Sequence, residues 1–413
     1  MTERLHAARY GHSMSASELS TVRPSSGGAT DALRRSNLAT VLGFVHRDGA
    51  LSRSDLTRLT GLNRSTVGDL VAELAALDLV EVDETPGGGR AGRPSPVVRV
   101  SGSVAAVAVN PEVDAVIVGL VGLGGRVLKR VRIETASARS AAETVTLASA
   151  GIAGMLAGES GIRIAGIGVA VPGQVRLSDG MVREATHFGW VDEPLAGMLS
   201  AATGYRVWAA NAAVLGLRAE SAFGAGRGVD DLVYMIGGAS GIGGGAIGGG
   251  RLLTGAAGYA GEFGHTFVRS DGRHCSCGSR GCLEAEVTQA ELLASVGLAS
   301  AEAASLADRL VATEDPAALA VIERDYALLS IAARNAVNVF NPSLLVLGGF
   351  LAALYRGARA HGAPDLLDDV VHSAREGVTV VEAELGTDQL LIGAAELVLA
   401  DLIADPARAL AAA

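Results

Sequence analysis

The sequence predicts an α/β protein in which a small helical module precedes a larger body of alternating strands and helices. The composition supports this class, because 49% of the 413 residues are hydrophobic, only 4% are aromatic and 55 are glycine. Apolar residues recur at helical spacing between residues 31 and 100, and β-rich runs alternate with helical segments from residue 103 onwards. A chain of this length is expected to form two or three domains.

Residues 1–30 are rich in Ser, Ala, Gly and Arg and lack hydrophobic periodicity, so a disordered tail is predicted there. The two folded parts are predicted to span residues 31–100 and 101–405. No apolar run reaches the roughly 18 residues of a membrane span, and no apolar segment follows a basic N-terminus. A cytoplasmic protein without a membrane partner is therefore expected.

Residues 31–100 have the pattern of a winged helix-turn-helix. Ser52 is predicted to cap a short second helix, Gly61 to form the turn, and Asn63 to cap a third helix. The apolar positions expected to pack these helices together are Leu33, Leu38, Val41, Leu42 and Val45 in the first, Leu56 and Leu59 in the second, and Val67, Leu70, Val71 and Leu74 in the third. Strands at Leu79–Val82 and Val97–Val100 would form the wing.

The start of the third helix and the wing loop supply the predicted DNA contacts. The first turn of the second helix-turn-helix helix enters the major groove, where arginine reads guanine and hydroxyl groups hold phosphates. Arginines on the glycine-rich loop GGGRAGRPS suit a narrow minor groove. The predicted DNA-binding residues are Arg53, Asn63, Arg64, Ser65, Thr66, Arg90 and Arg93. Residues 31–100 carry nine Arg and nine acidic residues, and the whole chain has a net charge of −10, so a protein-contact module is the alternative.

All three cysteines lie in one short stretch with the spacing C-x-C-x4-C. They are Cys275, Cys277 and Cys282, and His265 lies ten residues before the first. Zinc prefers four tetrahedral thiolate or imidazole ligands, and glycines at 278 and 281 permit a tight loop. Buried free cysteines are the alternative, but Ser, Gly, Arg and His surround them. An odd count without a secretory segment disfavours a disulfide. The stretch therefore predicts a structural zinc site.

The motif GE-x-GH, followed by CSCGSRGCLE, closely resembles the ROK family of repressors, open reading frames and sugar kinases. The segments N-L-A-x-V-L, G-x-L-S-R-x-x-L, T-G-L-x-R-S-T-V and G-R-P resemble the N-terminal module of ROK repressors. The resemblance implies zinc ligands at His265, Cys275, Cys277 and Cys282. It also implies sugar-binding residues at Gly173, Asn211, Glu262, His265 and Glu284, with His187 near a position where many relatives have Asn.

The same resemblance implies a two-lobed actin-like, ribonuclease H-like fold for residues 101–405. Lobe one would span about 101–225 plus the C-terminal helix, and lobe two about 226–390. The pattern agrees, with strands expected at Ala105–Val109, Val113–Val121, Val127–Ile133, Ala165–Val171, Leu232–Ile236, Gly241–Gly249 and Leu344–Leu347, and helices at Ala141–Leu156 and Leu391–Ile403.

Three features of ROK kinases can be compared with this sequence. The phosphate loop D-x-G-x-T would begin at Asn110, where the magnesium-binding carboxylate is missing, and Glu112 replaces its glycine. The catalytic base of the N-D-A motif is replaced by Ala212, which accepts no proton. Only the second-lobe glycine loop, Ala239–Gly243, is largely retained, and a glycine loop alone is weak evidence.

The sequence therefore predicts a sugar-responsive transcriptional regulator, a repressor, with a zinc-stabilised ROK domain and no catalytic residues. Operator DNA and a sugar or sugar derivative are the expected partners, and paired half-sites imply a homodimer or homotetramer. The alternatives are an ATP-dependent ROK sugar kinase, of the glucokinase or N-acetylmannosamine kinase type, with an added N-terminal domain, and a sugar-binding adaptor without DNA contact.

Overall fold

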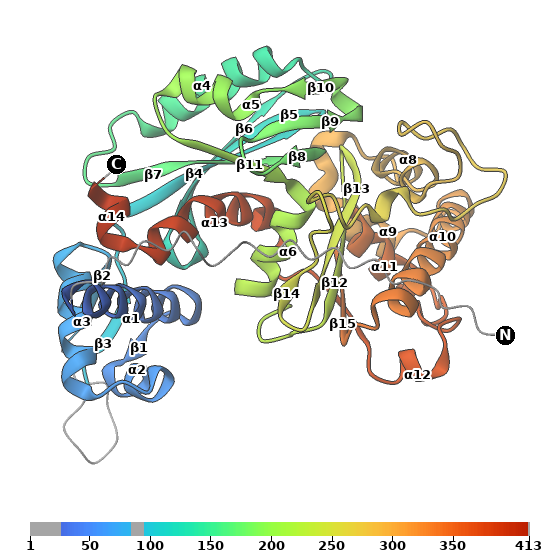
Figure 1. The fold of residues 1–413 in the computed structure, drawn as a ribbon. Coiled ribbons are helices and arrows are strands. Elements are labelled where there is room, and N and C mark those ends of the chain that lie inside the picture. Colours follow the sequence, from blue (N-terminus) through green and yellow to red (C-terminus); the bar gives the residue numbers. More distant parts are fainter. Residues whose placement is uncertain (1–25, 84–94, 412–413) are drawn as a thin grey trace, which may run out of the picture.

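The computed structural model describes residues 26–83 and 95–411 as a small N-terminal domain attached to a two-lobed body (Figure 1). The first helix, α1, spans Ser26–Asp48, so the prediction of a disordered tail to residue 30 is wrong for residues 26–30. No proline interrupts the chain between Ser26 and Asp48, and a helix held by tertiary packing extends by one hydrogen bond per added residue. Residues 1–25 and the wing loop, 84–94, lie outside the described residues.

The N-terminal domain has the predicted winged helix-turn-helix arrangement. Its elements after α1 are β1 (Leu51–Ser52), α2 (Arg53–Thr60), α3 (Arg64–Ala76), β2 (Val80–Asp83) and β3 (Val97–Val100), with the strands in the order β1-β3-β2. Both predicted caps are present, because Ser52 accepts from Asp55 N at 3.0 Å and Asn63 accepts from Thr66 N at 2.9 Å. Leu33 was expected to pack against the other helices, but its position on α1 leaves it 63% exposed.

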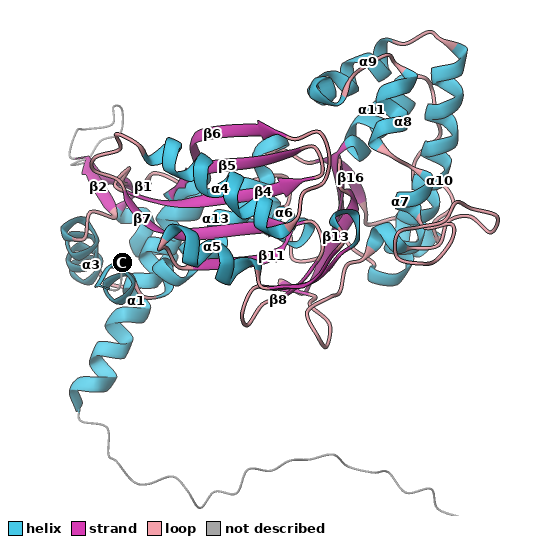
Figure 2. Ribbon diagram, turned by 90° about the horizontal axis from the view of Figure 1, so that it is seen from above, coloured by secondary structure: helices cyan, strands magenta, loops and turns pink. Residues whose placement is uncertain are grey.

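The first lobe is built on a five-stranded sheet in the order β11-β7-β4-β5-β6. These strands are β4 (Val104–Glu112), β5 (Ala115–Gly122), β6 (Arg126–Glu134), β7 (Arg163–Val171) and β11 (Val207–Asn211). Helices α4 (Ala141–Leu156) and α5 (Leu195–Thr203) cover one face, and α6 (Ala212–Phe223) and α13 (Gln389–Ala404) cover the other (Figure 2). Beside it lies a small sheet of β8 (Gln174–Arg176), β9 (Met181–Ala185) and β10 (Trp190–Glu193).

The second lobe contains the other five-stranded sheet, in the order β14-β13-β12-β15-β16. Its strands are β12 (Leu232–Gly238), β13 (Gly241–Gly248), β14 (Arg251–Leu252), β15 (Leu344–Gly349) and β16 (Thr379–Glu382). Its helices are α7 (Leu283–Glu286), α8 (Gln289–Ser295), α9 (Leu306–Ala312), α10 (Pro316–Phe340), α11 (Phe350–Ala360) and α12 (His372–Arg375), and α14 (Pro406–Ala411) follows α13. The domain and lobe limits given above remain a prediction.

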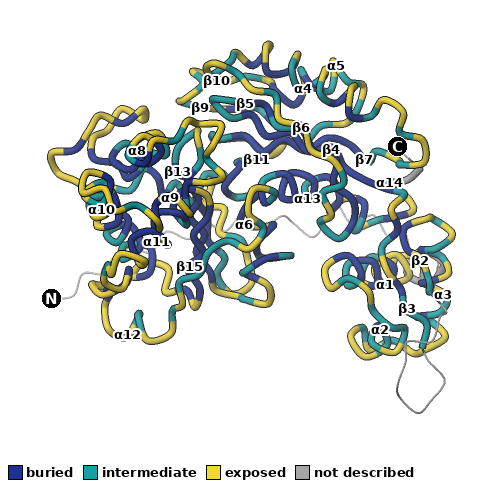
Figure 3. Tube along the Cα trace, turned by 180° about the vertical axis from the view of Figure 1, so that it is seen from behind, coloured by how far each residue is buried: buried dark blue, intermediate teal, exposed yellow. Residues whose placement is uncertain are grey.

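One apolar core joins the N-terminal domain to the first lobe. Val41 and Leu42 of α1 are buried in the same cluster as Leu399 and Leu402 of α13. Gly43 of α1 also faces Ile403 closely, since a Cβ there would lie 3.8 Å from that side chain. Figure 3 shows buried chain in the central strands of both sheets, whereas the outer helices carry many exposed residues. The N-terminal domain is therefore packed on the C-terminal helix of the body.

Within the described residues, no single helix is both long and apolar enough to cross a membrane. Among these residues, one pair of helical segments would be long and apolar enough if the two were counted together, but the pair is sharply bent. The segments are Leu283–Ser295 and Ser300–Ala312.

Candidate functional site

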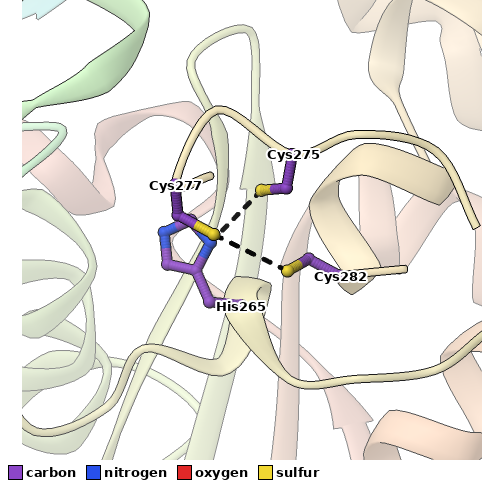
Figure 4. A group of neighbouring side chains, drawn as sticks. All are labelled: His265, Cys275, Cys277 and Cys282. Carbon is purple, nitrogen blue, oxygen red and sulfur yellow. Dashed lines mark hydrogen bonds between the residues drawn. The ribbon is translucent and has the colours of Figure 1, made fainter. Parts of the chain in front are cut away.

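His265 and the three cysteines converge in the second lobe (Figure 4). Their four candidate ligand atoms all lie within 4.8 Å of one another. The Sγ atoms of Cys277 and Cys282 are 3.8 Å apart, and Cys275 Sγ is 3.5 Å from His265 Nδ1. Metal–ligand bonds of about 2.0–2.3 Å place neighbouring ligands of a tetrahedral zinc roughly 3.3–3.8 Å apart. The cluster therefore fits a four-coordinate metal ion.

A tight loop brings the cysteines together. Gly278 and Gly281 both have positive φ, of 88° and 71°, and a side chain at Gly281 would collide with the carbonyl group of Arg269. Cys275 N donates to Ser279 O at 2.9 Å, which closes the turn. The predicted need for glycine at these positions is thus seen in the backbone itself.

A buried glutamate, Glu286, also supports the loop of the cluster, and the sequence pattern did not indicate it. Glu286 is only 2% exposed, accepts a hydrogen bond from Arg273 N and lies 3.5 Å from Arg269 Nη1. Burial raises the pKa of Cys275 to about 12 and also raises the pKa of Cys282. Without a cation these thiols hold their protons, so metal binding would release them.

The adjoining pocket lies between the lobes and contains every residue predicted to bind sugar. Gly173, Asn211, Glu262, His265 and Glu284 all line a cavity of about 180 Å³. One water needs roughly 10–15 Å³ on this measure, so the cavity has room for about a dozen non-hydrogen atoms. A monosaccharide has that size. Sequence reasoning did not find three further polar lining residues, Gln174, Glu184 and Thr186, although Gln174 directly follows Gly173.

His265 faces both the cysteine cluster and the pocket. Its Nδ1 lies 3.5 Å from Cys275 Sγ, and its Nε2 lies 3.9 Å from a carboxylate oxygen of Glu262. One imidazole can therefore bind a metal through Nδ1 and present Nε2 to the pocket, which is compatible with both predicted roles. Burial raises the pKa of Glu262, despite the opposing charge of His265.

His187 and Glu284 form a pair in the pocket wall. His187 Nε2 lies 3.5 Å from Glu284 Oε1, and the Glu284 side chain is only 7% exposed. Burial disfavours the charged carboxylate, yet the hydrogen bond from His187 and the nearby His265 hold the pKa of Glu284 below its usual value. The same hydrogen bond raises the pKa of His187. Gly241 leaves space for this pair, because a Cβ there would lie 2.7 Å from Glu284 Oε2.

The side chain of Asn211 forms hydrogen bonds mainly with backbone atoms of the pocket wall. Its side-chain oxygen accepts from Val214 N at 3.1 Å and caps α6, while its amide donates to Gly173 O at 3.0 Å. Ala212 follows as the first residue of α6 and also lines the pocket. A methyl group thus occupies the position at which the family resemblance places a catalytic carboxylate.

The predicted remnant of the phosphate loop is tied to the other lobe. Strand β4 continues through Asn110 to Glu112, three residues beyond the predicted end, because its pairing with β5 includes the Glu112–Ala115 register. Ser240, in the β12–β13 turn, donates through Oγ to Glu112 and accepts from Val113 N at 3.1 Å. Asn110 also donates to Glu112, at 3.3 Å. The Glu112 carboxylate therefore lies between the two loops, and burial raises its pKa.

The predicted DNA-contacting residues at the start of α3 lie on the surface. Arg64 and Ser65 are exposed, and Arg64 makes no ion pair with the described part of the chain. The Ser65 hydroxyl donates to Asn63 Oδ1 at 2.6 Å, so Asn63 supports the helix start as well as facing solvent. Arg53 is half-buried at the start of α2. Arg90 and Arg93 lie outside the described residues.

Comparison with known proteins now identifies the family. The ROK family model matches residues 107–401, and a MarR family model matches residues 39–91. The chain belongs to the ROK family. It is 30% identical over 302 residues to the glucokinase of Thermotoga maritima, covering 68% of this chain and 93% of that protein. It is 28% identical over 321 residues to the xylose repressor of Bacillus subtilis, covering 76% and 82%.

Two solved structures separate the shared ROK body from the added domain. A ROK transcriptional regulator, described as a homologue of the E. coli MLC protein, aligns with a TM-score of 0.69 at 22% identity and covers 91% of this chain and 98% of its own. A ROK glucokinase from Streptomyces griseus, in complex with glucose and AMPPNP, aligns with a TM-score of 0.59 at 26% identity and covers 71% and 98%. The predicted family and fold class are thereby confirmed.

Proposed function

We propose that this ROK protein is a sugar-responsive DNA-binding transcriptional regulator, a repressor, whose ROK domain senses a sugar without phosphorylating it. The observation that carries the proposal is the combination of a winged helix-turn-helix with a ROK pocket that retains Glu262, His265 and Glu284. The MarR family match and the similarity to xylose repressors support the DNA-binding part. Operator DNA and a sugar are the proposed partners, and such a regulator acts in the cytoplasm.

The absence of kinase activity is supported by three positions together. Phosphoryl transfer relies on a positioned metal ion and, in sugar kinases, on a base that accepts the hydroxyl proton. Asn110 is neutral, and Ala212 has no titratable group. Glu112 brings a carboxylate to the loop where phosphate would approach, and its bond to Ser240 joins the two loops. Glucokinases are among the relatives, so sugar kinase activity is the outcome that would contradict this proposal.

We propose zinc as the metal of the cluster, bound by His265, Cys275, Cys277 and Cys282. Three thiolates and one imidazole at tetrahedral spacing suit zinc, and four protein ligands leave no open position for catalysis. The metal would then hold His265 in the orientation that presents Nε2 to the pocket. Proposed sugar ligands are Gly173, Asn211, Glu262, His265 and Glu284, and Gln174 and Glu184 join them.

The proposed DNA contacts are Arg53, Asn63, Arg64, Ser65 and Thr66, with Arg90 and Arg93 on the wing loop. A homodimer or homotetramer would present two such modules to paired half-sites. Genome-wide mapping of bound DNA, followed by gel-shift titration at several salt concentrations, tests this part. The expected result is specific binding that a sugar weakens, because a repressor releases its operator when the effector binds.

A coupled ATPase assay across a panel of hexoses tests the sensing part against the kinase alternative. Sugar binding measured by calorimetry, without sugar-dependent ATP turnover, is the expected result. Turnover above background hydrolysis would establish the kinase alternative. Sugar binding without any DNA binding would instead establish the adaptor alternative.

A further inference from the structure

Two helices run from the sugar pocket to the DNA-binding domain. Ala212 and Ala213, in the first turn of α6, and Leu390, in the first turn of α13, all line the pocket. At the other end of α6, the ring of Phe223 lies 5.2 Å from the ring of His46 in an edge-to-face contact. Further along α13, Glu396 contacts the same histidine. The rise of 1.5 Å per residue makes these paths roughly 17 Å and 9 Å long.

His46 is a buried polar joint between the two domains. It lies on α1 of the winged helix-turn-helix and is only 2% exposed. Its Nδ1 accepts a hydrogen bond from Gly124 N at 2.9 Å, so the ring carries its proton on Nε2. That Nε2 lies 3.1 and 3.2 Å from the two carboxylate oxygens of Glu396 on α13. A single side chain of the DNA-binding domain is therefore held by α6, by α13 and by the turn after β5.

The backbones of α6 and α13 pack closely against each other. Gly393 of α13 lies so near α6 that a side chain there would collide with the carbonyl group of Leu215. On its other side, Gly168 of β7 leaves equally little room beside Ala394 of α13. Interiors packed at this density resist compression and transmit small shifts. Packing of this kind would carry a displacement at Ala212 or Leu390 toward His46.

We propose that the His46–Glu396 joint, with Phe223, is the element through which sugar in the pocket changes DNA binding. The inference rests on the proposed function and adds its route of regulation. Sugar binding biases the position of the α6 and α13 starts, and the joint passes that bias to α1, which packs against α3. Coupling of this kind requires that sugar and DNA prefer different arrangements of the same element. The contact between α1 and α13 is the part of the structure that would have two arrangements. His46 is a positioning residue in this contact and touches neither ligand.

The test measures how strongly sugar and DNA binding are coupled in variants of the joint. The full-length zinc-loaded protein is titrated with a duplex that wild type selects from a random-sequence library, with and without saturating D-xylose, D-glucose or N-acetylmannosamine. The coupling factor is the ratio of the two DNA dissociation constants, and typical factors are roughly 5- to 150-fold. In His46→Phe and Glu396→Leu we expect it to fall to about 1–2, with sugar affinity and sugar-free DNA affinity within about twofold of wild type.

Two further variants separate coupling from folding. Glu396→Gln keeps an oxygen that accepts from His46 Nε2, so it should retain most of the coupling. Asp401→Asn changes an exposed carboxylate farther along the same helix and should leave coupling unchanged. The double variant His46→Phe/Glu396→Leu should lose no more coupling than either single change, because both remove one interaction.

The outcomes distinguish failure of the proposed function from failure of the proposed route alone. If wild type binds none of these sugars or no DNA, the proposed function fails and the inference fails with it. If wild type responds to sugar and His46→Phe responds equally, the route is refuted while the function stands. Loss of coupling in Asp401→Asn as well would show a general effect of α13, which also refutes a specific joint.

Discussion

Replacing Cys277 with serine should remove the metal without disturbing the packing. Cys277 is the exposed member of the cluster, whereas Cys275 and Cys282 are buried. A surface substitution away from special features typically changes stability by no more than about 0.5 kcal/mol. Any larger loss in Cys277→Ser therefore reports the metal, because a serine hydroxyl stays protonated at neutral pH and is a poor zinc ligand.

The magnitude follows from linkage between metal binding and folding. If the substitution weakens zinc binding about 1,000-fold, the folded state loses about 4 kcal/mol at a zinc concentration that saturates wild type. Domains of 150–250 residues lose roughly 2–4 °C of melting temperature per kcal/mol, so a decrease of roughly 8–16 °C is expected. The second-lobe loop that holds Gly278 and Gly281 should unfold first, since the cluster ties it to His265.

Elemental analysis and calorimetric melting together provide the assay. Wild type should contain about one zinc per chain, since the described residues form one complete ligand set. Ser279→Ala is the matched control, because this exposed side chain lies in the same loop and its hydroxyl bonds nothing in the described chain. Zinc-free wild type, or a Cys277→Ser protein that keeps both its zinc and its melting temperature, would contradict this prediction.

Three other predictions follow from the structure. Ala212→Asp should not restore sugar-dependent ATP turnover, because base catalysis of typically 10²–10⁴-fold acts only on an aligned nucleotide, and a coupled assay with calorimetry would reveal either turnover or a change in sugar affinity. Arg64→Ala should cost about 1–3 kcal/mol at one base position of each half-site, whereas Arg90→Ala/Arg93→Ala should weaken binding evenly and flatten its salt dependence; unchanged affinity in both would make the module a protein-contact domain. Burial raises the pKa of Asp325 to about 6 from 3.8, so the folded state favours the protonated carboxyl group. The resulting contribution to the free energy of unfolding is complete below about pH 4 and is lost as the pH rises through 6. Relative to Asp325→Asn, wild type should thus lose about 1–3 kcal/mol of unfolding free energy between pH 4 and 7.5 in urea titrations, and parallel pH profiles would contradict this.

Local signals in the sequence predicted local structure well. Ser52 and Asn63 were recognised as caps because a helix start needs an oxygen acceptor at one defined position, and both acceptors are used as expected. The cysteine spacing likewise defined the cluster, because its ligands lie within one loop and one preceding turn. Leu33 shows a limit of this approach. Helical spacing predicted that it would be packed, but spacing does not show how far along α1 the neighbouring elements extend, and Leu33 is exposed.

Contacts between distant segments could not be predicted in this way. His46 and Glu396 are 350 positions apart, and neither belongs to a motif. Their meeting depends on the C-terminal helix returning to the first lobe and on α1 packing against it. The tie between Glu112 and Ser240 is of the same kind, because the sequence showed only that Glu112 replaces the glycine of the phosphate loop. Its hydrogen bond to the opposite loop needed the arrangement of both sheets.

That tie also bears on the proposed regulation without a nucleotide. The resemblance to ROK kinases places a phosphate loop at Asn110 and a glycine loop at Ala239–Gly243. Here Glu112 accepts from Ser240 and Asn110 and so joins the two loops within the chain. In the proposed function, a sugar is the small molecule whose binding would change the relation of the lobes. Because Asn211 caps α6 in the pocket wall, a change there would act, on the proposed route, on the helices that contact the N-terminal domain.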